Sequence, residues 1–160
     1  MSLSDAQQRF LKGVHFAVVA TIAANGLPHQ TVMWYALEGD QLLLSTPRES
    51  LKHKHLQRDP RLSVCVEDHY TYLTLTGAVT LDEEAGRARA DYRRLQKRYQ
   101  PTLARLMVAF MLRSGMAWVK SLLRPRAARR VSGSRAPDLL SRERVTLHMK
   151  IEKVHGSGLT

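Results

Sequence analysis

The stretch STPRESLKHKHLQRDPR, residues 45–61, gathers hydroxyl and basic side chains that could bind an anion. It contains five Lys or Arg and two His against two acids. Ser50 is a suitable N-cap for a helix that begins at Leu51, and the free N–H groups at a helix N-terminus bind phosphate well. The hydroxyls of Ser45 and Thr46 precede that helix. The pattern therefore predicts a phosphate cradle at this helix N-terminus.

Only some of these cations can face one ligand, because helical residues share a face when they are three or four apart. Lys52 belongs to the first turn of the predicted helix, and we interpret it as the main cation of the cradle. Lys54 and Arg58 share a different face, and Arg61 follows the end of the helix. We interpret these three as surface cations.

The rest of the chain lacks the residue patterns of hydrolases and metalloenzymes. There is no Ser-His-acid order and no pair of carboxylates at catalytic spacing. The single cysteine, Cys65, alternates with valines and is predicted to be a buried thiol. The seven histidines are scattered over different predicted elements. We therefore predict no metal site.

Size and composition predict one domain that spans residues 1–160. The chain is 44% hydrophobic and 24% charged, which suits a domain with its own core. The first ten residues, MSLSDAQQRF, lack the basic and apolar regions of a secretory signal, and no apolar run is long enough to span a bilayer. We expect a cytoplasmic protein.

The net charge of +11 is unevenly distributed along the chain. Residues 1–81 contain seven Lys/Arg and seven Asp/Glu, whereas residues 82–160 contain eighteen and seven. The positive electrostatic potential of the second half of the chain favours an anionic partner. Nucleic acid is the least favoured partner, and we predict none, because the basic residues lack interleaved aromatics. The apolar residues at helical spacing within 101–130 indicate packing on the fold or on a partner subunit, or peripheral contact with a membrane.

Alternating apolar residues predict a mainly β protein with helical insertions. Asn25-Gly26 indicates a hairpin turn, and Asp59-Pro60 ends the helix that begins at Leu51, because the residue before proline avoids helical angles. Closure of the strands into a six-stranded antiparallel barrel would remove exposed sheet edges. The predicted strands are 15–23, 28–37, 41–46, 61–68, 70–81 and 144–154, and the predicted short helices are 5–13 and 51–58.

A basic helical excursion at about 82–143 is predicted before the last strand. Its acids, residues 82–84, suit the positive end of a helix dipole. We expect the helix to break near Pro101 and to end near Leu123. Residues 124–142, rich in Arg, Ser, Pro and Gly, predict a loop.

Several of these segments, in this order, resemble a known family. VVATIAANGLPHQTVMWYALEGDQLLLSTPRESLKHKHLQRDPRLSVCVED, then YLTLTGAVTL, is similar to the FMN-binding split-barrel family that includes pyridoxamine 5'-phosphate oxidase, and especially to its F420-dependent reductases. RVTLHMKIEKVHG is similar to the closing strand of that family. The resemblance implies a homodimeric split β-barrel with two cofactor sites at the subunit interface.

The resemblance also implies which residues bind the cofactor. Strand residues Thr31, Val32, Met33 and Trp34 would lie against its tricyclic ring, mainly through backbone hydrogen bonds. Tyr72 would reach the site of the other subunit.

At the phosphate end of the cofactor, the resemblance implies hydrogen bonds from Ser45 and Thr46. Leu51 and Lys52 occupy the place where flavin-binding members often have Arg-Lys. Leu51 therefore departs from the pattern and leaves Lys52 as the principal cation, with Arg48 or Lys54 as possible substitutes.

These features predict an F420-dependent oxidoreductase, a flavoprotein-like enzyme that transfers hydride between the deazaflavin and an unsaturated or electron-poor substrate. The basic excursion would then provide counter-ions for the anionic tail of coenzyme F420. One alternative is an FMN-dependent oxidase or reductase of the pyridoxamine-phosphate oxidase type, which Leu51 disfavours. Another is a non-catalytic flavin, deazaflavin or tetrapyrrole binder, in which His69 or His148 could ligate a haem.

Overall fold

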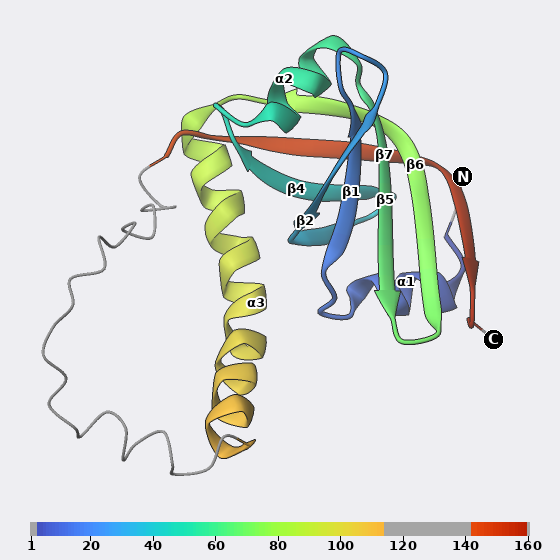
Figure 1. The fold of residues 1–160 in the computed structure, drawn as a ribbon, viewed down its shortest axis with the longest axis vertical. Helices are drawn as coiled ribbons and strands as arrows, with labels where there is room; N and C mark the ends of the chain where they lie inside the picture. The colour runs from blue at the N-terminus through green and yellow to red at the C-terminus, as the bar shows by residue number, and fades with distance from the viewer. Residues whose placement is uncertain (1–2, 114–141, 160) are drawn as a thin grey trace, which may run out of the picture.

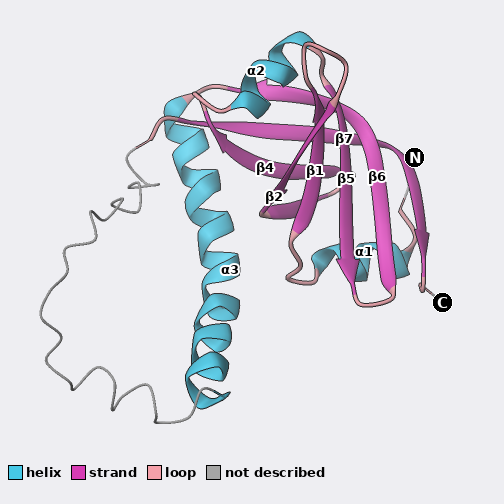
Figure 2. Ribbon diagram, in the orientation of Figure 1, coloured by secondary structure: helices cyan, strands magenta, loops and turns pink. Residues whose placement is uncertain are grey.

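The computed structural model describes residues 3–113 and 142–159. Within them, seven antiparallel strands form one curled sheet, and three helices surround it (Figure 1, Figure 2). The helices are α1 Asp5–Lys12, α2 Leu51–Arg58 and α3 Ala85–Arg113. The strands are β1 Ala17–Ile22, β2 Pro28–Met33, β3 Tyr35–Glu38, β4 Gln41–Pro47, β5 Arg61–Asp68, β6 Thr71–Asp82 and β7 Arg144–Ser157.

The predicted β split-barrel class is confirmed, with one strand more than expected. The strand order is β2-β1-β5-β6-β7-β4-β3, so that β2 and β3 lie at the two ends of the sheet. The segment 28–37, which we predicted as one strand, is interrupted at Trp34. Its first part pairs with β1 and its second part with β4. One continuous stretch of chain thus connects the two ends of the curled sheet, and β2 keeps an unpaired backbone edge.

The core lies inside the curl of the sheet. On β1, β5 and β6, the residues Val19, Val64 and Leu75 are opposite one another and fully buried. Burial of each such side chain stabilises the fold by about 1.5–3 kcal/mol. A second, smaller apolar cluster packs α3 on the outer face of β3 and β4 through Ala36, Leu43 and Leu95.

A β-bulge at Gly77 bends the long β6–β7 pair. Thr76 is opposite Lys153, whereas Gly77 is opposite Ile151, so that one residue of β7 is skipped. A Cβ atom at Gly77 would lie 1.9 Å from the carbonyl oxygen of Lys150. Only glycine therefore allows the two backbones to approach this closely.

The two short helices begin where the sequence predicts. Ser4 and Gln7 form a capping box at the start of α1. The Ser50 side chain accepts the backbone N–H of His53 at the start of α2. At the end of α1, Arg98 of α3 donates to the carbonyl oxygens of Leu11, Lys12 and Gly13.

Helix α3 is continuous at the point where a break was predicted. Glu84 accepts the backbone N–H groups of Gly86 and Arg87 at its start. The expected break near Pro101 is wrong, because α3 continues through it to Arg113 (Figure 1). Proline lacks an N–H, so one intrahelical hydrogen bond is missing there. Packing of the preceding turns on β4 and β7 fixes the helix in spite of that loss.

The rest of the predicted excursion lies outside the described residues. This applies to the helix end near Leu123, to the loop at 124–142 apart from residue 142, and to the side chains of the predicted membrane-contacting segment 101–130. Within 3–113 and 142–159, no helix combines the length and apolar character needed to cross a membrane.

Candidate functional site

A pocket of about 230 Å³ lies where β2, β4, α2, α3 and the start of β7 meet. One side of it is apolar and the other is rich in hydroxyl and cationic groups. The residues that line it are Val32, Met33, Trp34, Ser45, Thr46, Pro47, Lys52, Tyr92 and Arg144. Six of the ten residues that sequence reasoning assigned to a cofactor are among them: Val32, Met33, Trp34, Ser45, Thr46 and Lys52.

The apolar side belongs to the unpaired end of the sheet. Val32 is 65% exposed, although it is paired with Val18 of β1. The adjacent Thr31 is opposite the buried Val19, does not line the pocket, and has a buried hydroxyl without a hydrogen-bond partner. Because β2 is an edge strand, its backbone N–H and C=O groups on the outer side are not used by the sheet.

Helix α3 fixes the Trp34 side chain. The indole is stacked on Tyr92, with ring centroids 6.1 Å apart, and on Tyr99, with centroids 5.2 Å apart. The Tyr99 hydroxyl donates to the carbonyl oxygen of His15 at 2.6 Å and accepts the Tyr35 N–H. Burial raises the pKa of Tyr99, so this hydroxyl remains a donor at neutral pH. Trp34 is thus a rigid wall rather than a mobile side chain.

Sequence reasoning missed Tyr92, although a signal for it exists. Over residues 85–100, the part of α3 whose side chains are described, the buried residues are Ala88, Tyr92, Leu95 and Tyr99, with the spacing of one helical face. The periodicity predicts a buried stripe but cannot predict which strand it covers. The basic excursion therefore does reach the pocket, through an aromatic residue.

The polar side of the pocket is built from a chain of hydroxyl groups. Ser45 and Thr46 are buried at the end of β4. Thr46 Oγ1 lies 2.8 Å from Ser50 Oγ, which in turn accepts the His53 N–H that begins α2. Ser50 therefore orders both the helix N-terminus and the Thr46 hydroxyl, but does not itself line the pocket.

Two cations, Lys52 and Arg144, line the same pocket. Burial lowers the pKa of Lys52, and repulsion from Arg144 lowers it further. Burial also lowers the pKa of Arg144. The nine lining residues include no Asp or Glu. The pocket consequently has a positive potential on the side of its hydroxyl groups.

Leu51 and Tyr72, the remaining predicted site residues, lie outside this pocket. Leu51 is 56% exposed at the start of α2. Tyr72, on β6, is 44% exposed. Within one chain, neither of them lines the pocket that contains Lys52.

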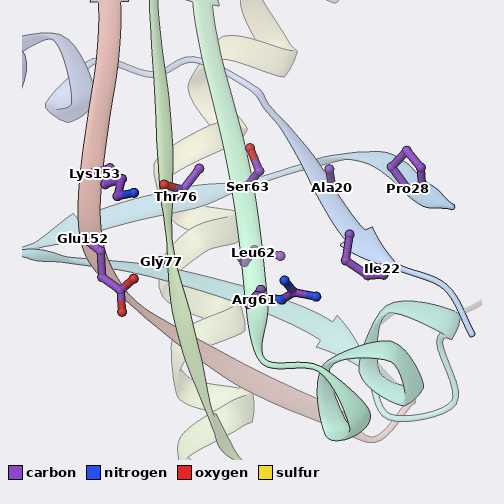
Figure 3. Close-up of a pocket in the computed structure, with 10 residues that line it drawn as sticks. All are labelled: Ala20, Ile22, Pro28, Arg61, Leu62, Ser63, Thr76, Gly77, Glu152 and Lys153. Carbon is purple, nitrogen blue, oxygen red and sulfur yellow. The ribbon is translucent and has the colours of Figure 1, made fainter. Parts of the chain in front are cut away.

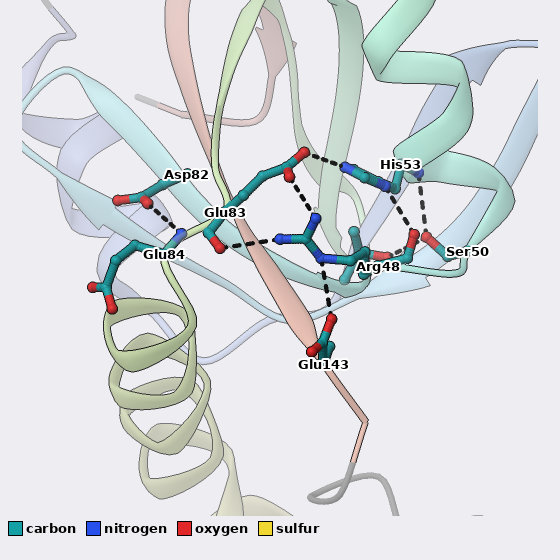
Figure 4. A network of polar contacts seen from close by, with 8 residues as sticks. Arg48, Ser50, His53, Asp82, Glu83, Glu84 and Glu143 are labelled. Carbon is teal, nitrogen blue, oxygen red and sulfur yellow. Dashed lines mark hydrogen bonds and ion pairs between the residues drawn. The ribbon is translucent and has the colours of Figure 1, made fainter.

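Arg48 is engaged elsewhere, in a polar network behind the cradle (Figure 4). Its guanidinium lies 2.6 Å from Glu83 and 3.4 Å from Glu143. The buried His53 places Nε2 2.9 Å from Glu83 Oε1 and Nδ1 2.8 Å from the Arg48 carbonyl oxygen. The hydrogen bond with His53, and then the charge of Arg48, lower the pKa of Glu83. This network ties α2 to the β6–α3 junction.

Several cations of the excursion also serve the fold. Arg87 pairs with Asp82 and Glu84, and Arg94 pairs with Glu38. These contacts, with that of Arg98 to the end of α1, leave fewer α3 cations for a ligand than the sequence suggests.

A second hollow, of about 460 Å³, lies on the outer face of the sheet (Figure 3). Its floor is a row of small side chains in register, Ala20 on β1, Ser63 on β5 and Thr76 on β6. Glu152 and Lys153 of β7 lie at its margin. It contains no residue predicted to bind the cofactor. In the part of the chain that the structure describes, no group of three or more His, Cys, Asp or Glu could hold a metal ion.

The curled sheet, with a pocket at its unpaired end, defines a β split-barrel protein. The chain matches the pyridoxamine 5'-phosphate oxidase family model over residues 3–117. The chain therefore belongs to the pyridoxamine 5'-phosphate oxidase family. None of the curated protein sequences matches it.

Solved structures with the same fold include proteins with different descriptions. An F420 reductase is 18% identical, with a TM-score of 0.66 over 96% of this chain and 98% of that one. A conserved hypothetical protein of Mycobacterium tuberculosis is 21% identical, with a TM-score of 0.61 over 98% and 85%. A FAD-binding protein of Mesorhizobium loti is 17% identical, with a TM-score of 0.60 over 98% and 95%. At these identities the likeness shows the fold.

Proposed function

We propose that the protein is an F420-dependent oxidoreductase that transfers hydride between the deazaflavin and an unsaturated or electron-poor organic substrate. The observation that carries the proposal is the pocket itself. It brings a free strand edge and the Met33–Trp34 wall to the same place as the Ser45 and Thr46 hydroxyls and Lys52. The structural likeness to an F420 reductase supports it.

The residues present suit both ends of such a cofactor. The cofactor, when bound, supplies the hydride chemistry, so the protein has to position it and exclude water. The backbone edge of β2 would bind the polar edge of the ring, and Trp34, held by Tyr92, would exclude water from one side. Lys52 and the two hydroxyls would hold the phosphate end.

FMN is a second candidate cofactor, and one observation favours it. Leu51 removes the usual arginine from α2, but Arg144 supplies a cation to the same pocket from β7. The absence of an arginine at position 51 is therefore no longer an argument against binding of the FMN phosphate.

Titration of the purified protein with each cofactor tests the proposal. We expect F420 to bind at micromolar or lower concentration, and its reduced form to be oxidised when an electron-poor alkene is added. Absorbance of the deazaflavin reports both steps. A yellow protein that binds FMN and ignores F420 would establish the second candidate instead. Tight binding without turnover over a broad panel of acceptors would indicate a carrier.

We also propose that the protein is a homodimer with the pocket at the interface. A volume of 230 Å³ is below the roughly 300–1,000 Å³ of small-molecule sites, so a second wall would complete it. Exposed Val18 and Val32 lie side by side on the outer face of the sheet. That face also contains Glu152 and Lys153. In an isologous interface the same surface of both subunits is paired, so a surface with both an acidic and a basic side chain can be complementary to itself.

Introduction of a charge on this face should separate the dimer. Val18→Glu is expected to convert a dimer to a monomer in sedimentation velocity, because the interface would have to bury an unpaired carboxylate. Ala90→Glu, on the exposed side of α3, is the matched control and should leave the dimer intact. A wild-type protein that is monomeric at all concentrations would contradict the proposal.

A further inference from the structure

Two histidines, His55 of α2 and His29 of β2, lie together where α2 packs on the β1–β2 hairpin (Figure 1). Thr21 and His29 are opposite each other on β1 and β2. His55 Nδ1 lies 3.0 Å from Thr21 Oγ1, and that hydroxyl donates to the His29 carbonyl oxygen at 3.4 Å. The centroids of the two imidazole rings are 5.4 Å apart, and the rings are nearly perpendicular. One polar cluster of three residues therefore ties α2 to both strands of the hairpin.

The hydrogen bonds of this cluster suit neutral rings. Thr21 is fully buried, and His55 is 9% exposed. The Thr21 hydroxyl gives its single hydrogen to the His29 carbonyl oxygen, so the hydrogen of the bond between His55 and Thr21 belongs to His55 Nδ1. His29 Nδ1 is buried without a hydrogen-bond partner, so a proton added there would have no acceptor among the described residues.

The charges that face the pair are positive. Within residues 3–113 and 142–159, no acidic side chain forms an ion pair or hydrogen bond with either histidine. Strands β1 and β4, on which α2 packs, contain no ionisable residue, β2 contributes His29 itself, and α2 contributes Arg58. Asp59, at the end of α2, is paired with Arg61. Burial lowers the pKa of His55, and the neighbouring His29 and Arg58 lower it further.

The two histidines belong to elements that form opposite sides of the pocket. Val32 follows His29 on β2, and Lys52 precedes His55 by one turn of α2. Val32 and Lys52 both line the pocket. Movement of α2 away from the hairpin would therefore separate the cation of α2 from the apolar wall.

We propose that His29, His55 and Thr21 form a proton-sensitive latch, which holds α2 on the β1–β2 hairpin at neutral pH and releases it in mild acid. A proton on His55 would place a buried charge beside Arg58 and His29 without a counter-ion. Release of α2 relieves that cost and disrupts the Lys52 side of the pocket. The inference rests on the proposed function only where it concerns cofactor affinity, because the release itself involves no ligand.

The direction of the pH effect follows from proton linkage. The folded protein binds the His55 proton more weakly than the unfolded chain does, in which histidine has its ordinary pKa of about 6.5. The contribution of the latch to the free energy of unfolding is therefore present above about pH 6.5. It is lost as the pH falls from there through the lowered pKa of His55.

Hydrogen exchange followed by mass spectrometry tests the latch without a ligand. We expect the amide protection of α2, corrected for the intrinsic exchange rate, to fall by at least about threefold between about pH 7.5 and about pH 5. In His55→Asn the fall should be absent, because the asparagine amide can still donate to Thr21 but does not titrate. His155→Gln removes an exposed histidine of β7 and is the matched control, in which the fall should remain.

An NMR titration of the wild-type His55 ring keeps the test decisive if His55→Asn fails to fold. The midpoint should lie below the ordinary value of about 6.5 and should rise in His29→Phe, which keeps an aromatic ring but removes a like charge. A midpoint at or above the ordinary value would overturn the latch.

Cofactor binding separates the latch from the proposed function. Acid loosening of α2 in a protein that binds neither F420 nor FMN would sustain the latch while the proposed function fails. Binding and turnover of F420, with α2 protection that is unchanged between about pH 7.5 and about pH 5, would overturn the latch and leave the function standing.

Discussion

Gly77→Ala is expected to destabilise the folded protein by about 4 kcal/mol or more, the range of severe single substitutions. The added methyl group would lie 1.9 Å from the Lys150 carbonyl oxygen, which belongs to backbone in the centre of the sheet. Neither strand can move away without loss of β6–β7 hydrogen bonds. Urea unfolding followed by circular dichroism would measure the change.

Gly26→Ala provides a control for this prediction. Gly26 has a φ of +81°, but a Cβ there would meet nothing within 4 Å. The substitution should therefore cost only the backbone strain of a left-handed residue, about 1–2 kcal/mol. Equal losses for the two variants would show that the close approach at the bulge is relieved without cost, contrary to our expectation.

Lys52→Ala is expected to weaken binding of the phosphorylated cofactor by about 1.5–3 kcal/mol, or roughly 10- to 150-fold. The reason is the loss of the only cation that α2 contributes to the pocket lining. Lys54→Ala removes the same charge from an exposed position two residues away and should change the affinity little. Isothermal titration at neutral pH would measure both. Equal affinities of wild type and Lys52→Ala would remove Lys52 from the site.

The pH dependence of binding offers an independent check on Lys52. Its pKa is lowered in the free protein, so it loses its proton at a lower pH than an exposed lysine would. Affinity for the anion should fall as the pH rises through this lowered value, because neutral lysine no longer attracts phosphate. In Lys52→Ala this alkaline decline should be absent.

The parts that sequence reasoning predicted well depend on local signals. Ser50 and Asp59 determine the ends of α2 through capping and the following proline, and alternation of apolar residues determines β5 and β6. The family pattern also named six of the residues that line the pocket. Those residues lie in two segments, 32–34 and 45–52, that are close together in the sequence and belong to the same family pattern.

The parts that it missed depend on contacts between distant residues. Arg144 and Ser45 are 99 positions apart, and Tyr99 and Tyr35 are 64 positions apart. No local pattern signals that a helix aromatic will stack on Trp34 or that the first residue of the last strand will face Lys52. The continuation of α3 through Pro101 has the same origin, because tertiary packing outweighs a local preference.

The place of β7 in the sheet has a consequence for the order in which the protein can be completed. β7 lies between β6 and β4, so among the described strands it is the one that joins the β3–β4 pair to the strands β2-β1-β5-β6 by backbone hydrogen bonds. During synthesis the six earlier strands emerge as two separate sheet fragments with unprotected edges. The sheet becomes continuous, and Arg144 enters the pocket, only when β7 has been made. Assembly of the fold and assembly of the binding site are therefore the same late event.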